Sequence, residues 1–384
     1  MDRQLPPLSL YVHLPWCVRK CPYCDFNSHR AGKSAQFDRY VSALDADIEM
    51  EARRAPGRPI DSVFLGGGTP SLFSAASIGR ILAAIRRSFT LRHDCEITME
   101  ANPGTVERGS LAEYRSAGVT RLSIGAQSFD AGMLRALGRI HGPDDIVATY
   151  AEACEAKFES INLDVMFALP GQDVDGAAAD VEKLLSLAPP HVSYYQLTLE
   201  PNTVFHRQPP ENMPDDDTAW AIQEQGQQML RDAGYEQYEI SAFAVAGHRC
   251  RHNLNYWQFG DYLAAGAGAH GKLTDASGAT SRYRKPANPL QFMEQAERGE
   301  MLTSIASVPA RDLAFEFMLN ALRLSGGFSA RLLRERTGID SAYLGEPLGR
   351  AIADGLLEET DTGHWRPTGL GFRFLNDLQA RFLP

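Results

Sequence analysis

The sequence predicts an α/β fold, an open partial barrel of six βα units, with a smaller and mostly helical domain behind it. Two observations support this prediction. From Leu8 onward, short runs rich in β-branched and aromatic residues alternate with longer segments in which apolar residues recur every three or four positions, which is typical of a parallel sheet covered by helices. Six such units fit before Gly234, whereas a closed barrel needs eight.

The units can be assigned in order along the chain. The expected strands are 8–13, 62–65, 96–100, 121–124, 160–167 and 192–199. The helices expected after them are 34–54, 75–88, 108–117, 131–137 with 144–156, 176–187 and 218–233. In the first helix, for example, Phe37, Val41, Leu44 and Ile48 fall on one face. Residues 237–243 are one further candidate strand.

The organisation beyond the barrel follows from where this regularity ends. We expect a barrel core at 1–240, a core extension with an aromatic and glycine-rich tract at 241–308, and a C-terminal domain at 309–384. In the last of these, an apolar segment at 313–324 precedes a helix, a strand, a tight turn, a strand and a helix. That order resembles a winged helix, and the acidic chain favours a capping or docking role over DNA binding.

Composition excludes several classes of protein. The chain has 384 residues, 44% of them hydrophobic, and a formal net charge of -10, which argues against a nucleic-acid partner and against attachment to anionic lipid. No run reaches the length of a membrane span, and the first ten residues lack the apolar core of a signal peptide. Six cysteines without a secretory signal indicate reduced thiols. We therefore expect a cytoplasmic protein.

The motif that carries the chemistry is Cys17-x3-Cys21-x2-Cys24, directly after the first strand. Three thiolates at this spacing can hold an iron–sulfur cluster, and a [4Fe–4S] cluster ordinarily takes four. The next cysteine is Cys95, so one iron would be left open for another ligand. Two other interpretations remain at this point: an incomplete zinc site, and a redox pair at Cys21 and Cys24 with Cys17 as a bystander.

Polar or glycine-rich features follow the other strands, at the end of the barrel where working groups gather. Gly66-Gly67-Gly68-Thr69 follows the second strand, Glu100 ends the third, Gln127 follows the fourth, and Asp164 lies within the fifth. Three glycines permit positive φ and close approach of a ligand to the backbone. Taken alone, these residues are also compatible with a tight turn and a solvated acid, and Arg139 with a surface helix end.

The cysteine motif, extended to Tyr11-Val12-His13-Leu14-Pro15-Trp16-Cys17 and to Cys24-Asp25-Phe26, resembles the radical S-adenosylmethionine (SAM) superfamily. The branch it resembles contains oxygen-independent coproporphyrinogen III oxidases and a heme chaperone. The resemblance runs from Leu10 to Leu324 and implies a (β/α)6 fold, a [4Fe–4S] cluster on Cys17, Cys21 and Cys24, and SAM on the open iron. It implies SAM contacts at Tyr11, Tyr23, Gly67, Gly68, Thr69, Glu100, Gln127, Arg139 and Asp164.

Two features distinguish the members of that branch. The oxidases carry a fourth cysteine two positions after the third, where this chain has Phe26, and this puts oxidase activity in doubt. Residues 24–28 and the His252-Asn253-Leu254-Asn255-Tyr256-Trp257 motif match the chaperone instead. The resemblance therefore implies a protein that binds heme and transfers it to an acceptor protein, and we assign no catalytic residue.

His252 is the candidate heme contact, because imidazole is a common axial ligand of heme iron; the other interpretation is that it braces a loop beneath the cluster. An electron donor such as flavodoxin or ferredoxin would be needed if SAM is cleaved. The alternatives in function are anaerobic decarboxylation of coproporphyrinogen III, and a cluster protein that acts on an unrelated substrate.

Overall fold

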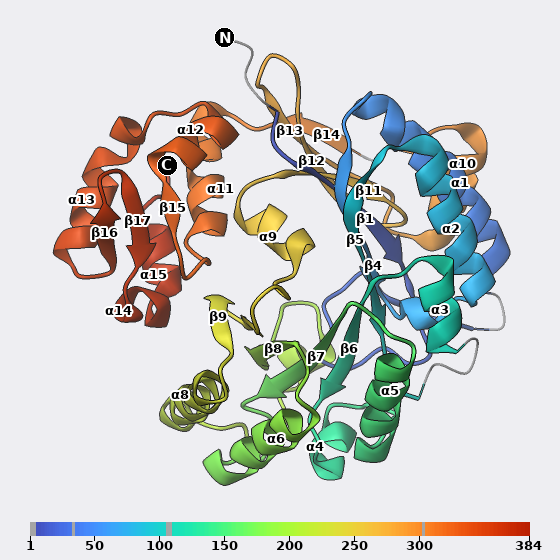
Figure 1. The fold of residues 1–384 in the computed structure, drawn as a ribbon, viewed down its shortest axis with the longest axis horizontal. Helices are drawn as coiled ribbons and strands as arrows, with labels where there is room; N and C mark the ends of the chain where they lie inside the picture. The colour runs from blue at the N-terminus through green and yellow to red at the C-terminus, as the bar shows by residue number, and fades with distance from the viewer. Residues whose placement is uncertain (1–4, 33–34, 105–109, 302–303) are drawn as a thin grey trace.

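A computed structural model describes residues 5–32, 35–104, 110–301 and 304–384. Figure 1 shows a strongly curved sheet with helices along its outer side and the C-terminal domain at its open side. The first residue of the predicted helix 34–54 and the first two of the predicted helix 108–117 lie outside the described residues. The first helix begins at Phe37.

The six predicted strands form the centre of one twelve-stranded sheet and pair in parallel, each beside the next along the chain. They are β1 (Leu8–Leu14), β4 (Ile60–Gly67), β5 (Leu91–Ala101), β6 (Arg121–Gln127), β7 (Ser160–Phe167) and β8 (His191–Gln196). The fold class is therefore confirmed: a partial barrel whose sheet is open.

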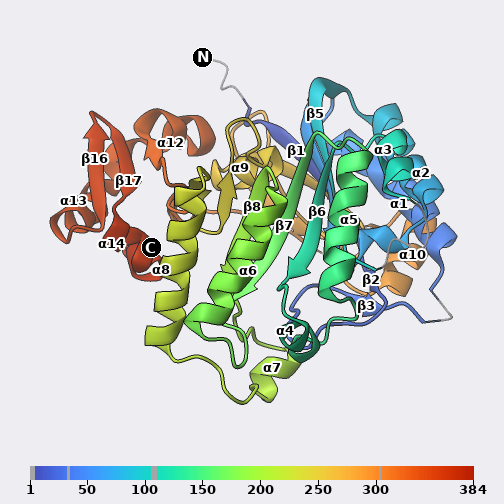
Figure 2. The ribbon, with the colours of Figure 1, turned by 60° about the horizontal axis from the view of Figure 1, so that its bottom comes forward.

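Helices cover the outer face of these strands, and Figure 2 shows α5, α6 and α8 in front of β6 to β8. The helices are α1 (Phe37–Arg54), α2 (Ala75–Ser88), α3 (Leu111–Ala117), α4 (Ala131–Ala136), α5 (Pro143–Glu155), α6 (Val174–Leu187), α7 (Val204–Arg207) and α8 (Asp216–Asp232). The main apolar core lies between helices and sheet, and includes Leu122 and Ile124 of β6. The alternate residues of β6, Arg121 and Ser123, face the inside of the barrel, because successive side chains of a strand point to opposite faces.

The sheet continues past the six strands at both ends, and the sequence had indicated a further strand only at the end beside β8. Beside β1 lies β11 (Asp261–Ala265), in parallel, and beyond it β12 (His270–Thr274), β13 (Thr280–Arg284) and β14 (Ser304–Ser307) run antiparallel to their neighbours. Beside β8 lie β10 (Ala242–Ala244) and β9 (Glu236–Glu239), so the single candidate strand at 237–243 is two short strands. The extension also contains α9 (Arg251–Trp257) and α10 (Pro289–Arg298).

The C-terminal residues form a second core around Phe317, Phe328 and Leu378, to which Phe259 of the extension contributes. Its elements are α11 (Ala310–Ala321), β15 (Phe328–Ser329), α12 (Ala330–Thr337), α13 (Gly345–Ala353), β16 (Leu357–Asp361), β17 (His364–Pro367), α14 (Gly369–Arg373) and α15 (Leu375–Ala380). The helix–strand–turn–strand order matches the prediction, but the last helix is interrupted at Phe374. Within the described residues, no helix combines the length and apolar character needed to cross a bilayer.

Candidate metal centre and cofactor cavity

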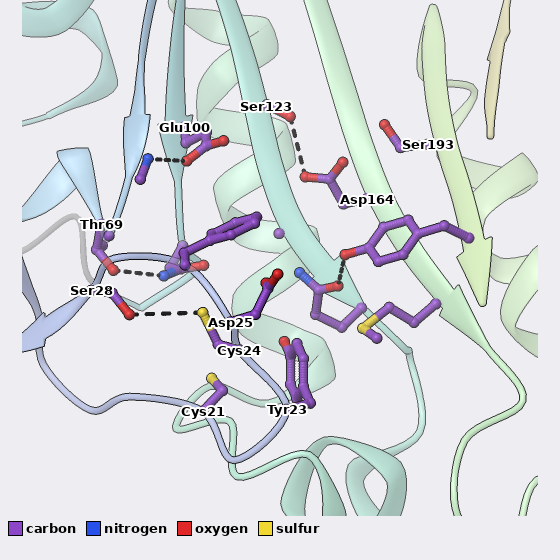
Figure 3. Close-up of a pocket in the computed structure, with 18 of the residues that line it drawn as sticks. Cys21, Tyr23, Cys24, Asp25, Ser28, Thr69, Glu100, Ser123, Asp164 and Ser193 are labelled. Atoms are coloured by element: carbon purple, nitrogen blue, oxygen red, sulfur yellow. Dashed lines mark hydrogen bonds between the residues drawn. The ribbon is translucent and has the colours of Figure 1, made fainter. Parts of the chain in front are cut away.

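A cavity of about 560 Å³ opens at the carboxyl ends of the parallel strands and continues into the inside of the barrel. All three cysteines of the motif line it, together with the glycine segment after β4 and inward side chains of β5 to β8. Figure 3 shows Cys24, Glu100 and Asp164 pointing toward a common space from separate elements. Parallel strands bring their carboxyl ends to one edge of a sheet, which explains why residues so distant in sequence meet here.

The cysteine loop is closed by a short parallel pair, β2 (Trp16–Cys17) with β3 (His29–Arg30). The amide of Ala31 donates to the carbonyl of Cys17 at 2.7 Å. Asn27 fastens the loop to the extension, because its Nδ2 donates to the carbonyl oxygens of Ala267 and Ala287, each at 2.9 Å. The cysteines are therefore carried on a loop held at both ends.

The surroundings of the thiols fit their proposed chemistry. Burial raises the pKa of the Cys17 and Cys24 thiols, while hydroxyl groups of Thr69 and Ser28 act in the opposite direction. Arg139 Nη1 lies 3.7 Å from Cys21 Sγ. All six cysteines are free, and among the described residues no three His, Cys, Asp or Glu side chains converge on a point where one metal ion could be held.

Metals bind the thiolate form of cysteine. The hydroxyl groups of Thr69 and Ser28 and the guanidinium of Arg139 favour that form. Three such thiols on one cavity suit an iron–sulfur cluster, in which each cysteine binds one iron.

The glycine segment is required mainly by packing. Gly67 has φ 112°, as expected for a position that needs glycine. A Cβ on Gly67 would lie 2.3 Å from Cε1 of His13, and one on Gly68 would lie 2.7 Å from the carbonyl oxygen of Trp16. Both glycines thus let the segment rest against β1 and the cysteine loop, and both also line the cavity.

Two carboxylates face the cavity. Glu100 Oε2 accepts a hydrogen bond from the amide of Gly67 at 3.0 Å, and burial raises its pKa to about 7. Asp164 accepts from Ser123 Oγ at 3.1 Å and from Asn162 Nδ2 at 2.8 Å (Figure 3), and burial raises its pKa as well. Neither acid is a solvated loop residue.

Gln127 and Arg139 are both fixed by neighbours. Gln127 has φ 69°, in the left-handed region that non-glycine residues avoid, and its Oε1 accepts from the Tyr195 hydroxyl at 2.8 Å. Arg139 Nη2 donates to Asn102 Oδ1 at 2.6 Å and to the carbonyl oxygen of Gly125 at 2.9 Å. Arg139 therefore belongs to the cavity, not to a surface helix end. The left-handed backbone of Gln127 is strained, and strain of this kind is common at ligand sites.

The remaining predicted residues lie in two different settings. Tyr23 and Thr69 line the cavity. Tyr11 and His252 are not among its lining residues: the Tyr11 hydroxyl lies 3.0 Å from Nδ1 of His13, and His252 Nδ1 lies 3.0 Å from Ser62 Oγ. His252 is 2% exposed, contacts the rings of Phe64 and Tyr256, and has its pKa lowered to about 3 by burial.

The cavity also contains residues that sequence reasoning missed. These are Asn102, Arg121, Ser123, Ser193, Tyr195, Asn253, Trp257 and Arg323. The signals available were weak: Asn102 is two residues after Glu100, and Arg121 begins a predicted strand. Asn253 and Trp257 belong to the histidine-led motif, of which only the histidine had been considered.

Comparison with known proteins places this arrangement in a family. The radical SAM superfamily model matches residues 11–184, and the HemN C-terminal domain model matches residues 308–374. Coproporphyrinogen III oxidase (HemN) from Escherichia coli, a solved structure, covers 99% of this chain and 91% of its own with a TM-score of 0.84, at 23% identity, which bears on the fold alone.

Sequence similarity is far higher to another group. The heme chaperone HemW of Escherichia coli K12 is 46% identical over 380 residues, and that of Haemophilus influenzae is 44% identical over 384; each match covers 99% of both chains. The HemW of Mycobacterium tuberculosis is 33% identical over 92% of this chain and 89% of its own. The chain belongs to the HemW family of radical SAM proteins.

Proposed function

We propose that this protein is a heme chaperone, which binds heme and passes it to an acceptor protein. The observation that carries the proposal is the 46% identity over 99% of both chains to a protein named as a heme chaperone. The likeness to coproporphyrinogen III oxidase lies in the fold. Phe26, which stands where those oxidases have their fourth cysteine, is 56% exposed at the cavity.

The radical SAM core would hold a [4Fe–4S] cluster on Cys17, Cys21 and Cys24, with SAM as the second cofactor. When bound, the cluster supplies electrons and an iron that the amine and carboxylate of SAM can chelate. The chain's own groups would orient SAM: backbone of Gly67 and Gly68 with Thr69 toward its amine, and the acids toward its hydroxyl groups. Glu100, Gln127, Arg139 and Asp164 line the cavity in positions that suit these contacts, with Tyr23 beside the cysteines.

Tyr11 and His252 would act differently. Tyr11 lies behind the cavity and would support the site through His13, whose Nε2 lies 2.9 Å from the carbonyl oxygen of Asn27 in the cysteine loop. His252 stays our candidate for contact with heme iron, but α9 would have to move for heme to reach a side chain that is 2% exposed. Cytoplasmic location, and a flavodoxin- or ferredoxin-type donor if SAM is cleaved, complete the proposal.

Heme titration of the anaerobically reconstituted protein, followed at the Soret band, tests the proposal. We expect saturation at one heme per chain, and a changed Soret band in a His252→Ala variant if that side chain contacts the iron. Weak and unsaturable binding would contradict the chaperone function. A parallel product assay with coproporphyrinogen III under reducing conditions tests the alternative, because formation of protoporphyrinogen would establish decarboxylation.

A further inference from the structure

The inner end of the cavity, defined by Arg121, Asn253, Trp257, Arg323 and Glu239, contains none of the proposed SAM contacts, although Arg121 lies within electrostatic reach of Asp164. Arg121 and Gln127 are the first and last residues of β6, so the strand rise alone puts their backbones roughly 20 Å apart. The inner end is formed by the start of β6, by α9, by β9 and by the residues after α11. None of these segments carries a cysteine of the cluster motif.

Arg121 is the centre of this region and is 3% exposed. Its Nε has no hydrogen-bond partner, and its guanidinium forms no ion pair with a described residue. The neighbouring acids are occupied elsewhere. Glu96 Oε1 accepts from the amides of Arg251 and His252 at the start of α9, at 3.0 and 3.4 Å, and Asp164 accepts from Ser123 and Asn162. A buried charge without a direct counter-ion is costly, and such groups normally have one.

Two further N–H groups at the inner end are also buried without a hydrogen-bond acceptor in the described chain. Trp257 Nε1 and Arg323 Nε are buried, and neither has a partner among the described residues. The Arg323 guanidinium lies 4.3 Å above the Trp257 ring, and its Nη2 lies 3.3 Å from Glu239 Oε2. The Glu239 carboxylate is itself engaged by this arginine and by the amide of Ser241 at 3.1 Å. Three N–H groups on three segments therefore lack an acceptor beside one cavity.

We propose that the inner end of the cavity binds a carboxylate of the cargo, with Arg121, Trp257 and Arg323 as its donors. A carboxylate only accepts hydrogen bonds and offers about four acceptor positions, which suits a site made of cations and an indole N–H. The inference rests on the proposed function, because heme carries two propionate carboxylates on an otherwise apolar macrocycle.

The same assignment gives the histidine-led motif a function on α9. Asn253 and Trp257 are one helical turn apart and line the cavity. The other members have structural contacts: Asn255 Nδ2 donates to the carbonyl oxygen of Asp261 at 2.8 Å, and Tyr256 packs on Tyr262. The motif thus presents Trp257, and not its histidine, to the cavity in this structure.

The test compares heme with heme dimethyl ester, which keeps the macrocycle and iron but has no free carboxylate. The wild-type protein should bind heme about tenfold or more tightly than the ester, since a hydrogen bond to a charged group is worth about that factor. Arg121→Gln and, separately, Trp257→Phe should weaken binding of heme and reduce its advantage over the ester. Trp257→Phe keeps an aromatic ring under Arg323 but removes the N–H together with part of the indole ring system. SAM affinity should not change in either variant.

Arg282→Gln is the matched control. The Arg282 guanidinium is already bound by Glu316 at 2.6 Å and by the Tyr262 hydroxyl at 2.6 Å, and the residue does not line the cavity. This variant should keep the wild-type preference for heme. Unliganded Arg121→Gln should have a Tm no lower than that of the wild type, because it removes a buried charge without a counter-ion.

The outcomes separate the two proposals. If the wild type binds neither ligand, heme carriage itself is wrong. If it binds heme and the ester equally, or if both variants keep the preference, heme carriage stands and the carboxylate site is refuted. A lowered Tm of Arg121→Gln with an intact preference would show that Arg121 is structural. A loss of SAM affinity in both variants, with heme binding unchanged, would assign the inner end to SAM and also overturn the proposal.

Discussion

Lys285 is the centre of a buried charge network between α1 and β13, and its removal is predicted to destabilise the protein strongly. Its Nζ lies 2.5 Å from Asp47 Oδ1 and 2.7 Å from Glu51 Oε1, and all three side chains are fully buried. The Tyr283 hydroxyl donates to Glu51. Asp47 Oδ2 also accepts from the amide of Gly266, at 2.9 Å. The network therefore joins the first helix to the segment that holds the cysteine loop.

Lys285→Met should lower the free energy of unfolding by about 3–5 kcal/mol, because it leaves Asp47 buried without a cation and leaves Glu51 with Arg54 alone, whose Nε lies 3.1 Å from Glu51 Oε1. The loss should depend on pH. Burial already raises the pKa of Asp47 to about 6, while Lys285 opposes that rise. A raised acid pKa means that the folded state holds its proton longer, so stability falls as pH rises from about 4 to 6. In the variant this decline should be steeper and should extend to higher pH.

Urea unfolding of the unliganded protein at pH 5 and pH 8 measures both effects. Asp47→Asn/Glu51→Gln/Lys285→Met is the matched control, since it removes all three charges and should recover most of the loss. A single variant within about 1 kcal/mol of the wild type at pH 8, or a triple variant no better than the single one, would refute the reasoning.

Three further predictions concern the site and the local backbone. Cys21→Ala should lose the cluster, measured as iron per chain after anaerobic reconstitution, whereas Cys154→Ala, an exposed thiol outside the cavity, should keep it; equal iron in both would count against the cluster assignment. Glu100 has its pKa raised from 4.5 to about 7, so the unliganded protein should lose stability as pH rises across that interval. Glu100→Gln should flatten this part of the profile, and an unchanged slope in urea unfolding would contradict it. Ala188→Gly should raise the free energy of unfolding by about 1 kcal/mol, because Ala188 ends α6 with φ 50°; Ala179→Gly inside the same helix should lower it by a similar amount, and the same sign for both would be contrary to the argument.

The six central strands were predictable because each carries its own local signal. In β6 and β7 nearly every residue is buried, and apolar residues such as Leu122 and Ile124, which pack under the helices, alternate with polar residues that face the inside of the barrel. Their order followed from the chain, since short right-handed connections place successive strands side by side.

The strands of the extension carried no such signal. In β12 and β13 the buried positions include Lys272, which is 1% exposed and bound to Asp261 at 3.0 Å, and Tyr283, which is bonded to Glu51. Charged residues are normally read as exposed, and their burial depends on partners far away in sequence. The sequence also gives no sign of the break at Phe374, where neither glycine nor proline stands, so the last helix of the C-terminal domain was expected to be continuous.

The residues of the site likewise fall into those that have a local signal in the sequence and those that have none. The cysteines, Glu100 and Gln127 all line the cavity, and the sequence could single them out because they end or follow strands or form a spaced motif. Arg121 was missed because its importance lies in what surrounds it. In sequence it is the first residue of a strand, and only the structure shows a guanidinium at 3% exposure whose Nε has no partner in the described chain. Trp257 was overlooked because His252, in the same motif, is a common metal ligand and was the only residue of the motif considered.

The central claim is that three thiols on one cavity share a cluster with one open iron that SAM occupies. Electron paramagnetic resonance of the reduced, reconstituted protein before and after addition of SAM tests it most directly. We predict about four irons per chain and a spectrum that changes with SAM, with both features lost in Cys21→Ala. A spectrum that SAM leaves unchanged, in a protein that holds its full iron, would contradict the account.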